Sequence, residues 1–143
     1  MGALATRATD RRDCWRCRLD GELAALGVVR RQLRSYLAER AVPAAVAADI
    51  VLATQEAAKN AVLAGSGRRV TVAAWIEDEA IWVRVQDAGK GFAQRRSRRC
   101  PSVWSTHGRG LYLMQALMDE VEITHAHGTR VVMCRHIGVQ AAS

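Results

Sequence analysis

The sequence predicts a single α+β domain. Two segments with apolar residues at every third or fourth position are followed by two segments in which apolar residues alternate. A short helical segment and a closing pair of strands complete the order. With 143 residues, 50% of them hydrophobic, the chain has enough apolar material to close one core. We expect a basic, mobile tail over residues 1–12, one domain over residues 13–137 and a short C-terminal tail over residues 138–143.

Residues 13–19 read as a strand, after which Asp20-Gly21-Glu22 is expected to begin a helix. This first helix, over residues 21–40, has one apolar side, made of Leu23, Leu26, Val29, Leu33 and Leu37. Pro43 permits a second helix to start, which Gly65-Ser66-Gly67 ends. Its apolar stripe consists of Ile50, Ala53, Ala57 and Ala61.

Alternating patterns predict two strands over residues 69–76 and 80–86, with Glu77-Asp78-Glu79 as the hairpin turn. Residues 87–107 lack a periodic pattern and are expected to form a long loop, typical of lids and binding segments. A helix over residues 110–119 and strands over 120–125 and 129–136, turned at Gly128, complete the chain.

Composition excludes several classes of protein. No stretch reaches the roughly 18 apolar residues of a membrane helix, and the first dozen residues lack the apolar block of a secretory signal, so we expect a cytoplasmic protein. Cys14 and Cys17 have the spacing of redox and zinc sites, but they lie in a strand-like run without a second ligand pair, which favours a structural interpretation. His125 and His127 likewise lack further ligands. The net charge of +7 favours anionic partners without choosing among them.

Three short motifs carry candidate chemistry. Glu56 and Asn60 are four apart and share one helix face, where a carboxylate could take a proton and an amide oxygen could bind Mg²⁺. Asp87 follows a strand directly and precedes two glycines that permit close backbone approach to a ligand. Gly108-Arg109-Gly110-Leu111 opens a helix, where unpaired N–H groups form an anion site. Each motif alone also fits an ordinary helix face, turn or helix entry.

Together, in this order, the motifs resemble those of the GHKL (Bergerat-fold) ATPases, and within them the bacterial anti-sigma-factor serine kinases. EAAKNAV (56–62) is similar to the asparagine box, DAGKGF (87–92) and GRGL (108–111) to the two glycine boxes, and Gly128-Thr129 to the last shared feature. The resemblance covers residues 13–136. It implies a two-layer sandwich in which a mixed, mainly antiparallel sheet is covered on one face by helices.

The resemblance also implies a role for each matching residue. Asn60 would bind the Mg²⁺ that bridges the ATP phosphates, and Glu56 would act as the catalytic base or orienter for the acceptor hydroxyl. Asp87 would bind the adenine amino group, with Thr129 behind it. The glycine boxes would shape the adenine pocket and hold the phosphates, through Gly89 and Gly91 and through Gly108, Arg109, Gly110 and Leu111.

Two features depart from the family pattern. Ala64 stands where family members commonly have a histidine, four residues beyond the box asparagine, and Lys59 occupies a position that is usually small or polar. We favour a solvated Lys59 over a phosphate contact. The loop arginines Arg95, Arg96, Arg98 and Arg99 fit a phosphate or acidic partner as well as a charged loop.

The resemblance implies a kinase that binds a sigma factor and phosphorylates an anti-anti-sigma (STAS-type) protein, with ATP and Mg²⁺ as cofactors. The sequence leaves undecided whether the chain forms a homodimer, and no contact with nucleic acid or membrane is expected. The alternative is a regulatory module of the same fold that binds ATP or a partner without transferring phosphate. A small nucleic-acid binder ranks last, because only the charge favours it.

Overall fold

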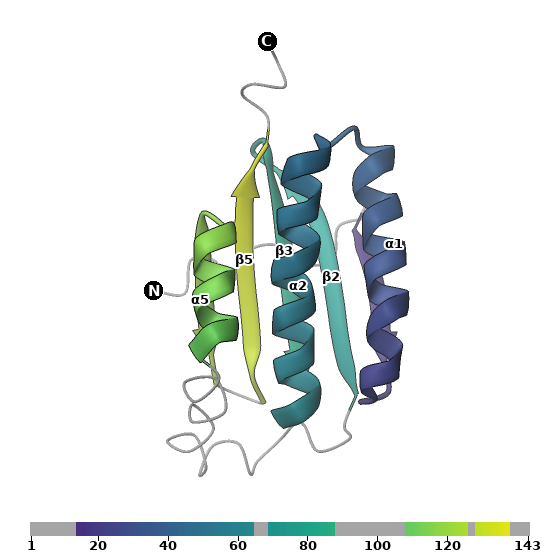
Figure 1. Cartoon of the computed structure of the whole chain (residues 1–143), viewed down its shortest axis with the longest axis vertical. Helices are drawn as coiled ribbons and strands as arrows, with labels where there is room; N and C mark the ends of the chain where they lie inside the picture. The colour runs from purple at the N-terminus through teal and green to yellow at the C-terminus, as the bar shows by residue number, and fades with distance from the viewer. Residues whose placement is uncertain (1–13, 65–68, 88–107, 126–127, 138–143) are drawn as a thin grey trace.

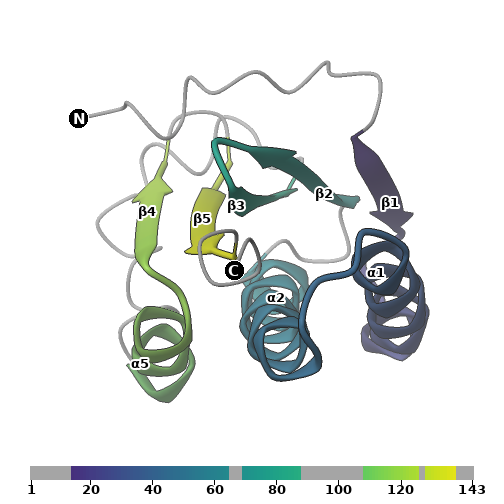
Figure 2. The same cartoon turned by 90° about the horizontal axis from the view of Figure 1, so that it is seen from above.

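The computed structural model describes residues 14–64, 69–87, 108–125 and 128–137. These residues form two layers, a five-stranded sheet and three α-helices that all lie on one of its faces (Figures 1 and 2). The strands are β1 (Trp15–Leu19), β2 (Val70–Glu77), β3 (Ala80–Asp87), β4 (Glu120–Thr124) and β5 (Arg130–His136). The helices are α1 (Leu26–Glu39), α2 (Ala44–Ala64) and α5 (Gly108–Leu117), with a short 3-10 helix over Leu23–Ala25.

The order of strands in the sheet is β1-β2-β3-β5-β4. The predicted α+β class and two-layer sandwich are confirmed, and each described pairing is antiparallel, so the mixed sheet implied by the resemblance is antiparallel over the described strands. The tails over residues 1–12 and 138–143, and most of the predicted loop over 87–107, lie outside the described residues.

The first helix begins later than the sequence predicted. Gly21 has a φ of 83°, in the left-handed region that a right-handed helix excludes, so only a short 3-10 turn precedes α1. Leu23, expected on the apolar side, is therefore 49% exposed, whereas Val29 and Leu33 are fully buried. The α5 helix instead begins earlier than expected, at Gly108.

The β2–β3 hairpin confirms the predicted turn. Asp78 and Glu79 both have positive φ, 56° and 59°, as the two central residues of the tight turn between antiparallel strands require. From the turn, the pairing of β2 with β3 continues along both strands to the pair of Val70 with Asp87. The turn therefore fixes where the last residue of β3 lies.

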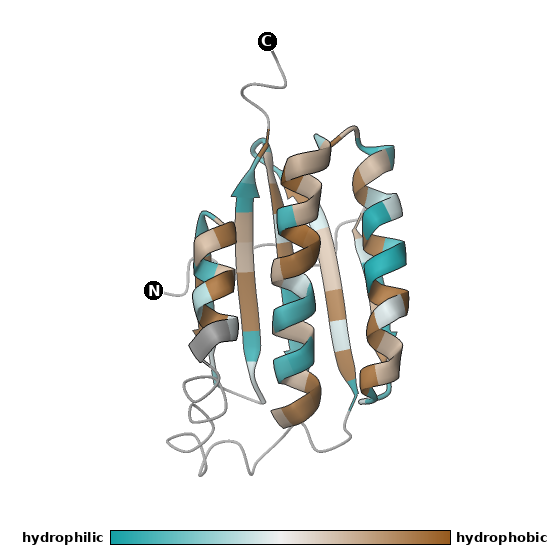
Figure 3. Ribbon diagram, in the orientation of Figure 1, coloured by the Kyte–Doolittle hydropathy of each residue, from teal (hydrophilic) through white to brown (hydrophobic). Residues whose placement is uncertain are grey.

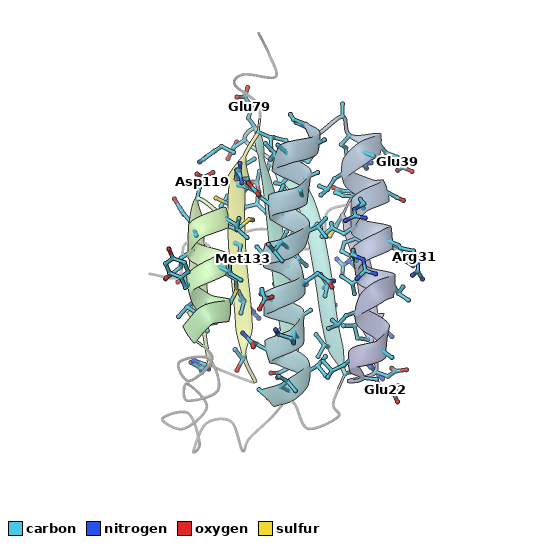
Figure 4. All side chains as sticks on the ribbon, in the orientation of Figure 1. Glu22, Arg31, Glu39, Glu79, Asp119 and Met133 are labelled. Carbon is cyan, nitrogen blue, oxygen red and sulfur yellow. The ribbon has the colours of Figure 1, made fainter. Side chains whose placement is uncertain are left out.

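The helices cover the sheet with an apolar layer. Helix α2 lies between α1 and α5 (Figure 1), and its predicted stripe of Ile50, Ala53, Ala57 and Ala61 is buried. Figure 3 shows apolar colour in the middle of β5 and on several turns of α2, with hydrophilic turns between them. Met133 of β5 (Figure 4) is fully buried in the core. A second buried cluster lies on the opposite face of the sheet, where Trp75 and Trp82 stack with ring centroids 6.4 Å apart.

Within the described segments, none of the helices combines the length and the apolar character that crossing a membrane requires.

Candidate functional site

Asn60 is a buried polar residue about one turn before the end of α2. Its side chain is 1% exposed, and neither Oδ1 nor Nδ2 has a hydrogen-bond partner within the described part of the chain. Leaving a buried amide without partners costs about 1–3 kcal/mol per group, so such residues are rare unless they bind something. Glu56 lies one turn earlier on the same face of the helix.

The first turn of α5 packs against this pair. A Cβ atom added to Gly110 would lie 3.0 Å from Asn60 Nδ2 and 3.2 Å from Glu56 Oε1. Any side chain at this position would therefore crowd both groups, and glycine permits the close approach. The structure thus brings Glu56, Asn60 and Gly110 together at the N-terminal end of α5, where the helix dipole and the unpaired N–H groups favour an anion.

The other residues of the second glycine box lie in the same helix. Gly108 and Arg109 are the first two residues of α5, and the partly buried Leu111 packs against the core. The second glycine box therefore forms the start of α5, and Leu111 anchors this start to the core.

Lys59 contacts Glu56 directly. The distance from Lys59 Nζ to Glu56 Oε1 is 3.3 Å, with side chains that are 45% and 17% exposed. The Lys59 side chain is therefore partly exposed to solvent, as favoured above, and its ammonium is also paired with Glu56, which the sequence analysis did not expect. The three-residue spacing on a helix is the signal that could have predicted the pair.

Asp87 ends β3 as a buried carboxylate, 5% exposed. Its N–H donates to the carbonyl of Thr129 at 3.1 Å, and its Oδ1 accepts a hydrogen bond from the Thr129 N–H at 3.3 Å. Gly128, with a φ of 92°, precedes this buried threonine in the β4–β5 turn. The turn thereby holds the carboxylate in place at the end of the sheet.

His125, which the sequence analysis considered only as a metal ligand, is a neighbour of this pair. Its Nδ1 lies 3.3 Å from Thr129 Oγ1. Burial lowers the pKa of His125, and the nearby Asp87 carboxylate raises it by a smaller amount. A neutral imidazole is therefore favoured beside Thr129 near pH 7.

Both groups of residues lie at the same end of the molecule. Asp87 follows Val83 and Val85 with the period of two that directs all three toward the helices. Figure 1 shows the C-terminal part of α2, the end of β3, the start of α5 and the start of β5 at one end of the sheet. Asn60 and Asp87 thus face the same end of the helix–sheet interface.

Other predicted candidates have different outcomes. Gly89, Gly91, His127 and the four loop arginines lie outside the described residues. Cys14 and Cys17 are free thiols, and burial raises the pKa of Cys17, which disfavours the thiolate that redox chemistry needs. The described segments contain no cluster of three or more His, Cys, Asp or Glu side chains suited to a metal ion.

Comparison with known proteins matches residues 19–135 to the histidine kinase-like ATPase domain family. The chain is 33% identical over 102 residues to the anti-sigma F factors of a Thermoanaerobacter species and of Caldanaerobacter subterraneus subsp. tengcongensis, covering 64% of this chain and 71% of each relative.

A solved structure gives the same result. The crystal structure of the RsbU and RsbW domains of Rv1364c from Mycobacterium tuberculosis superposes with a TM-score of 0.68 at 29% identity, covering 87% of this chain. The present chain spans 32% of that longer protein. It therefore belongs to the histidine kinase-like (GHKL) ATPase family, in the branch that contains the anti-sigma factors.

Proposed function

We propose that this chain is an anti-sigma regulator that binds ATP with Mg²⁺ and phosphorylates an anti-anti-sigma protein on serine or threonine. The main observation behind this proposal is the side-chain amide of Asn60, which is buried beside Glu56 and the first turn of α5 without a hydrogen-bond partner in the described chain. Family membership supports the ATP-binding part, and the relatives named anti-sigma F factor support the regulatory part.

The adenine end of the proposed site is Asp87. A buried carboxylate offers only hydrogen-bond acceptors, which suits an exocyclic amino group such as that of adenine. Thr129 supports this contact by fixing the position of Asp87 Oδ1. The glycines Gly89 and Gly91 complete this end in the proposal.

The phosphate end is the start of α5, formed by Gly108, Arg109, Gly110 and Leu111. Its N–H groups suit phosphate oxygens. Asn60 Oδ1 fits Mg²⁺, because it is an oxygen ligand without another hydrogen bond in the described chain. When bound, the metal ion neutralises charge on the phosphates.

Glu56 supplies the base in this proposal. Its carboxylate is partly exposed and adjacent to Asn60, so an acceptor hydroxyl can reach it from solvent. As the hydroxyl oxygen bonds to the γ-phosphorus, the bond from this phosphorus to the β–γ bridging oxygen breaks, and Glu56 takes the hydroxyl proton. Lys59 restrains the Glu56 carboxylate through their ion pair.

The proposed partners are a sigma factor and a STAS-type anti-anti-sigma protein, in the cytoplasm, and a second copy of the chain is a further proposed partner. The relatives' name carries the first of these, since an anti-sigma factor acts on a sigma factor. Nucleic acid and membrane are not part of the proposal.

The test is phosphoryl transfer from ATP to purified candidate antagonists by the Glu56→Gln variant. We expect nucleotide affinity to be kept within about twofold and transfer to fall by at least about a hundredfold, the usual contribution of a positioned base. Glu39→Gln, the same change at an exposed end of α1 (Figure 4), is the control and should leave both unchanged. Transfer by Glu56→Gln at the wild-type rate would overturn the catalytic role.

A second candidate function is a regulatory module that binds ATP without transferring phosphate. Ala64, in place of the commonly found histidine, favours it. Under this alternative, wild-type protein binds ATP, measured by calorimetry, yet transfers no phosphate to any antagonist that it binds.

A further inference from the structure

His125 continues a row of side chains across three neighbouring strands. Figure 2 shows β3, β5 and β4 side by side, in the order that their pairing gives. The register forms rows across these strands, and the last full row on the side that faces the helices consists of Val85, Val131 and Ile123. Two residues nearer the end of the sheet, the corresponding positions are those of Asp87, Thr129 and His125. The three polar residues therefore stand in one row, in that order.

Their side chains also lie on the same face of the sheet. Side chains two positions apart on a strand share a face, and the preceding row is part of the core beneath the helices or packs against it. The contacts agree with this arrangement, because His125 Nδ1 lies 3.3 Å from Thr129 Oγ1 and the Thr129 N–H donates to Asp87 Oδ1 at 3.3 Å. His125 is thus on the same side as the proposed nucleotide site.

The hydroxyl of Thr129 has two possible roles toward a ligand, since a hydroxyl both donates and accepts hydrogen bonds. If His125 Nδ1 carries a proton, it donates to Thr129 Oγ1, and the hydroxyl proton is left for a ligand. If Nδ1 instead accepts, the hydroxyl proton is used in this contact. The tautomer of His125 therefore decides whether Thr129 can donate to a ligand.

The charge of Asp87 favours the first tautomer. Burial lowers the pKa of His125, and the Asp87 carboxylate raises it by a smaller amount, so the ring is neutral near pH 7 and still within the field of this carboxylate. Because the row runs from His125 through Thr129 to Asp87, the ring edge that faces Thr129 also faces the negative charge. An N–H dipole directed toward a carboxylate is favourable, whereas a nitrogen lone pair in its place is unfavourable.

The row then presents an acceptor beside a donor. Asp87 accepts and the Thr129 hydroxyl donates, which matches a ligand edge with an amino group next to an acceptor nitrogen. Adenine has this edge in its exocyclic amino group and the ring nitrogen N1. Guanine has the opposite pattern, a carbonyl oxygen next to an N–H group, and would leave both protein groups without a suitable partner.

We propose that His125 is a positioning residue that fixes the Thr129 hydroxyl as a donor to adenine N1 and thereby strengthens the preference of the site for adenine. The proposal rests on the ATP site proposed above, and it adds a residue that the family motifs do not include. His125 acts through Thr129 and does not itself contact the nucleotide.

The test measures the affinity of the full chain for three nucleotides with Mg²⁺ by calorimetry. In 1-deaza-ATP a C–H group replaces N1 and the amino group is kept, whereas 7-deaza-ATP is changed at a ring nitrogen away from this edge. We expect wild type to bind 1-deaza-ATP about three- to tenfold more weakly than ATP, the usual net contribution of one hydrogen bond. Its affinity for 7-deaza-ATP should lie within about twofold of that for ATP.

Variants show whether His125 is responsible. His125→Leu should bind ATP and 1-deaza-ATP with affinities within about twofold of each other, because the hydroxyl is no longer held as a donor. His125→Asn should restore most of the difference, since its amide N–H lies near the position of Nδ1. Thr129→Val should also lose the difference, and adding His125→Leu to it should change nothing more. His136→Leu, an exposed position at the far end of β5, is the control and should bind all three nucleotides like wild type.

The outcomes separate this inference from the proposed function. If wild type binds no ATP, the nucleotide site itself is wrong. If wild type binds ATP and 1-deaza-ATP equally, the Thr129 hydroxyl is not a donor to N1 and the inference alone is overturned. The same holds if His125→Leu weakens all three nucleotides equally or keeps the wild-type difference. Circular dichroism of each variant checks that the fold is kept.

Discussion

Asp87 and Thr129 exchange two hydrogen bonds between the end of β3 and the β4–β5 turn, one through the backbone and one through Asp87 Oδ1. The carboxylate is thereby fixed in position by a residue 42 positions away in the sequence. The same hydrogen bonds let the fold and the proposed adenine contact be tested separately.

Asp87→Asn should keep the fold and lose nucleotide affinity. An asparagine Oδ1 still accepts the Thr129 hydrogen bond, whereas the negative charge that would favour an amino group is gone. We expect ATP affinity, measured by calorimetry, to fall about tenfold or more. Asp78→Asn, the same change in the hairpin at the other end of β3, should leave affinity unchanged. Unchanged affinity in Asp87→Asn would remove this residue from the adenine site.

Gly110→Ala should separate helix stability from ligand binding. A Cβ at this position meets Asn60 and Glu56 at 3.0 and 3.2 Å, so those side chains must shift. Alanine favours a helix by up to about 1 kcal/mol, which offsets part of the crowding, so we expect a small change in Tm but roughly tenfold weaker ATP binding.

Gly27→Ala is the matched control for this change. Its Cβ would meet only the ends of Arg30 and Arg31, at an ordinary 3.7 Å. We expect a gain of about 0.5 kcal/mol in the free energy of unfolding and unaltered ATP affinity. If both alanine variants bind ATP like the wild type, the close packing of α5 on Asn60 has no role in binding.

The sequence predicted the hairpin and α2 accurately for local reasons. Both β2 and β3 end within one residue of the expected positions, because alternation and the turn residues determine them. The start of α1 was wrong because apolar spacing carries no information on the left-handed backbone of Gly21. Local patterns thus define elements better than they define the backbone between them.

The site and the arginines on the uncovered face of the sheet differ in how far the sequence could predict their positions. Family motifs named Asn60 and Asp87, but His125 beside Thr129 depends on how the β4–β5 turn closes. Arg16 and Arg84 come into one row of the sheet only because β1 and β3 flank β2, where both pair with Ala73. Such non-local pairing does not follow from composition or periodicity.

Lys59→Met should test whether the Lys59–Glu56 pair matters for chemistry. A half-exposed ion pair contributes at most about 1 kcal/mol to folding, so we expect little change in Tm. If Lys59 restrains the Glu56 carboxylate, phosphate transfer should fall about three- to tenfold, because base positioning is lost. Lys59→Arg should restore most of the rate. A rate that is the same in all three proteins would show that the pair has no catalytic part.

Arg135→Met should destabilise the domain without affecting the proposed site. Arg135 Nη1 donates to Asp49 Oδ2 at 2.8 Å and to the Leu117 carbonyl at 2.7 Å, which ties β5 to both α2 and α5. Because these side chains are partly exposed, we expect a loss of about 1–2 kcal/mol in urea unfolding. A double-mutant cycle with Asp49→Asn isolates the pair, and a coupling free energy near zero would contradict its structural role.

His125 predicts a specific dependence of stability on pH. Burial lowers its pKa in the folded state, so the unfolded chain takes up a proton first as the pH falls. The free energy of unfolding should therefore decrease from about pH 6.5, the ordinary histidine pKa, down to the lower folded-state value. Urea unfolding of wild type and His125→Gln at about pH 7.5 and pH 5.5 measures this, and the variant should lose less stability over the interval. An equal loss in the two proteins would show that His125 does not bind fewer protons in the folded state.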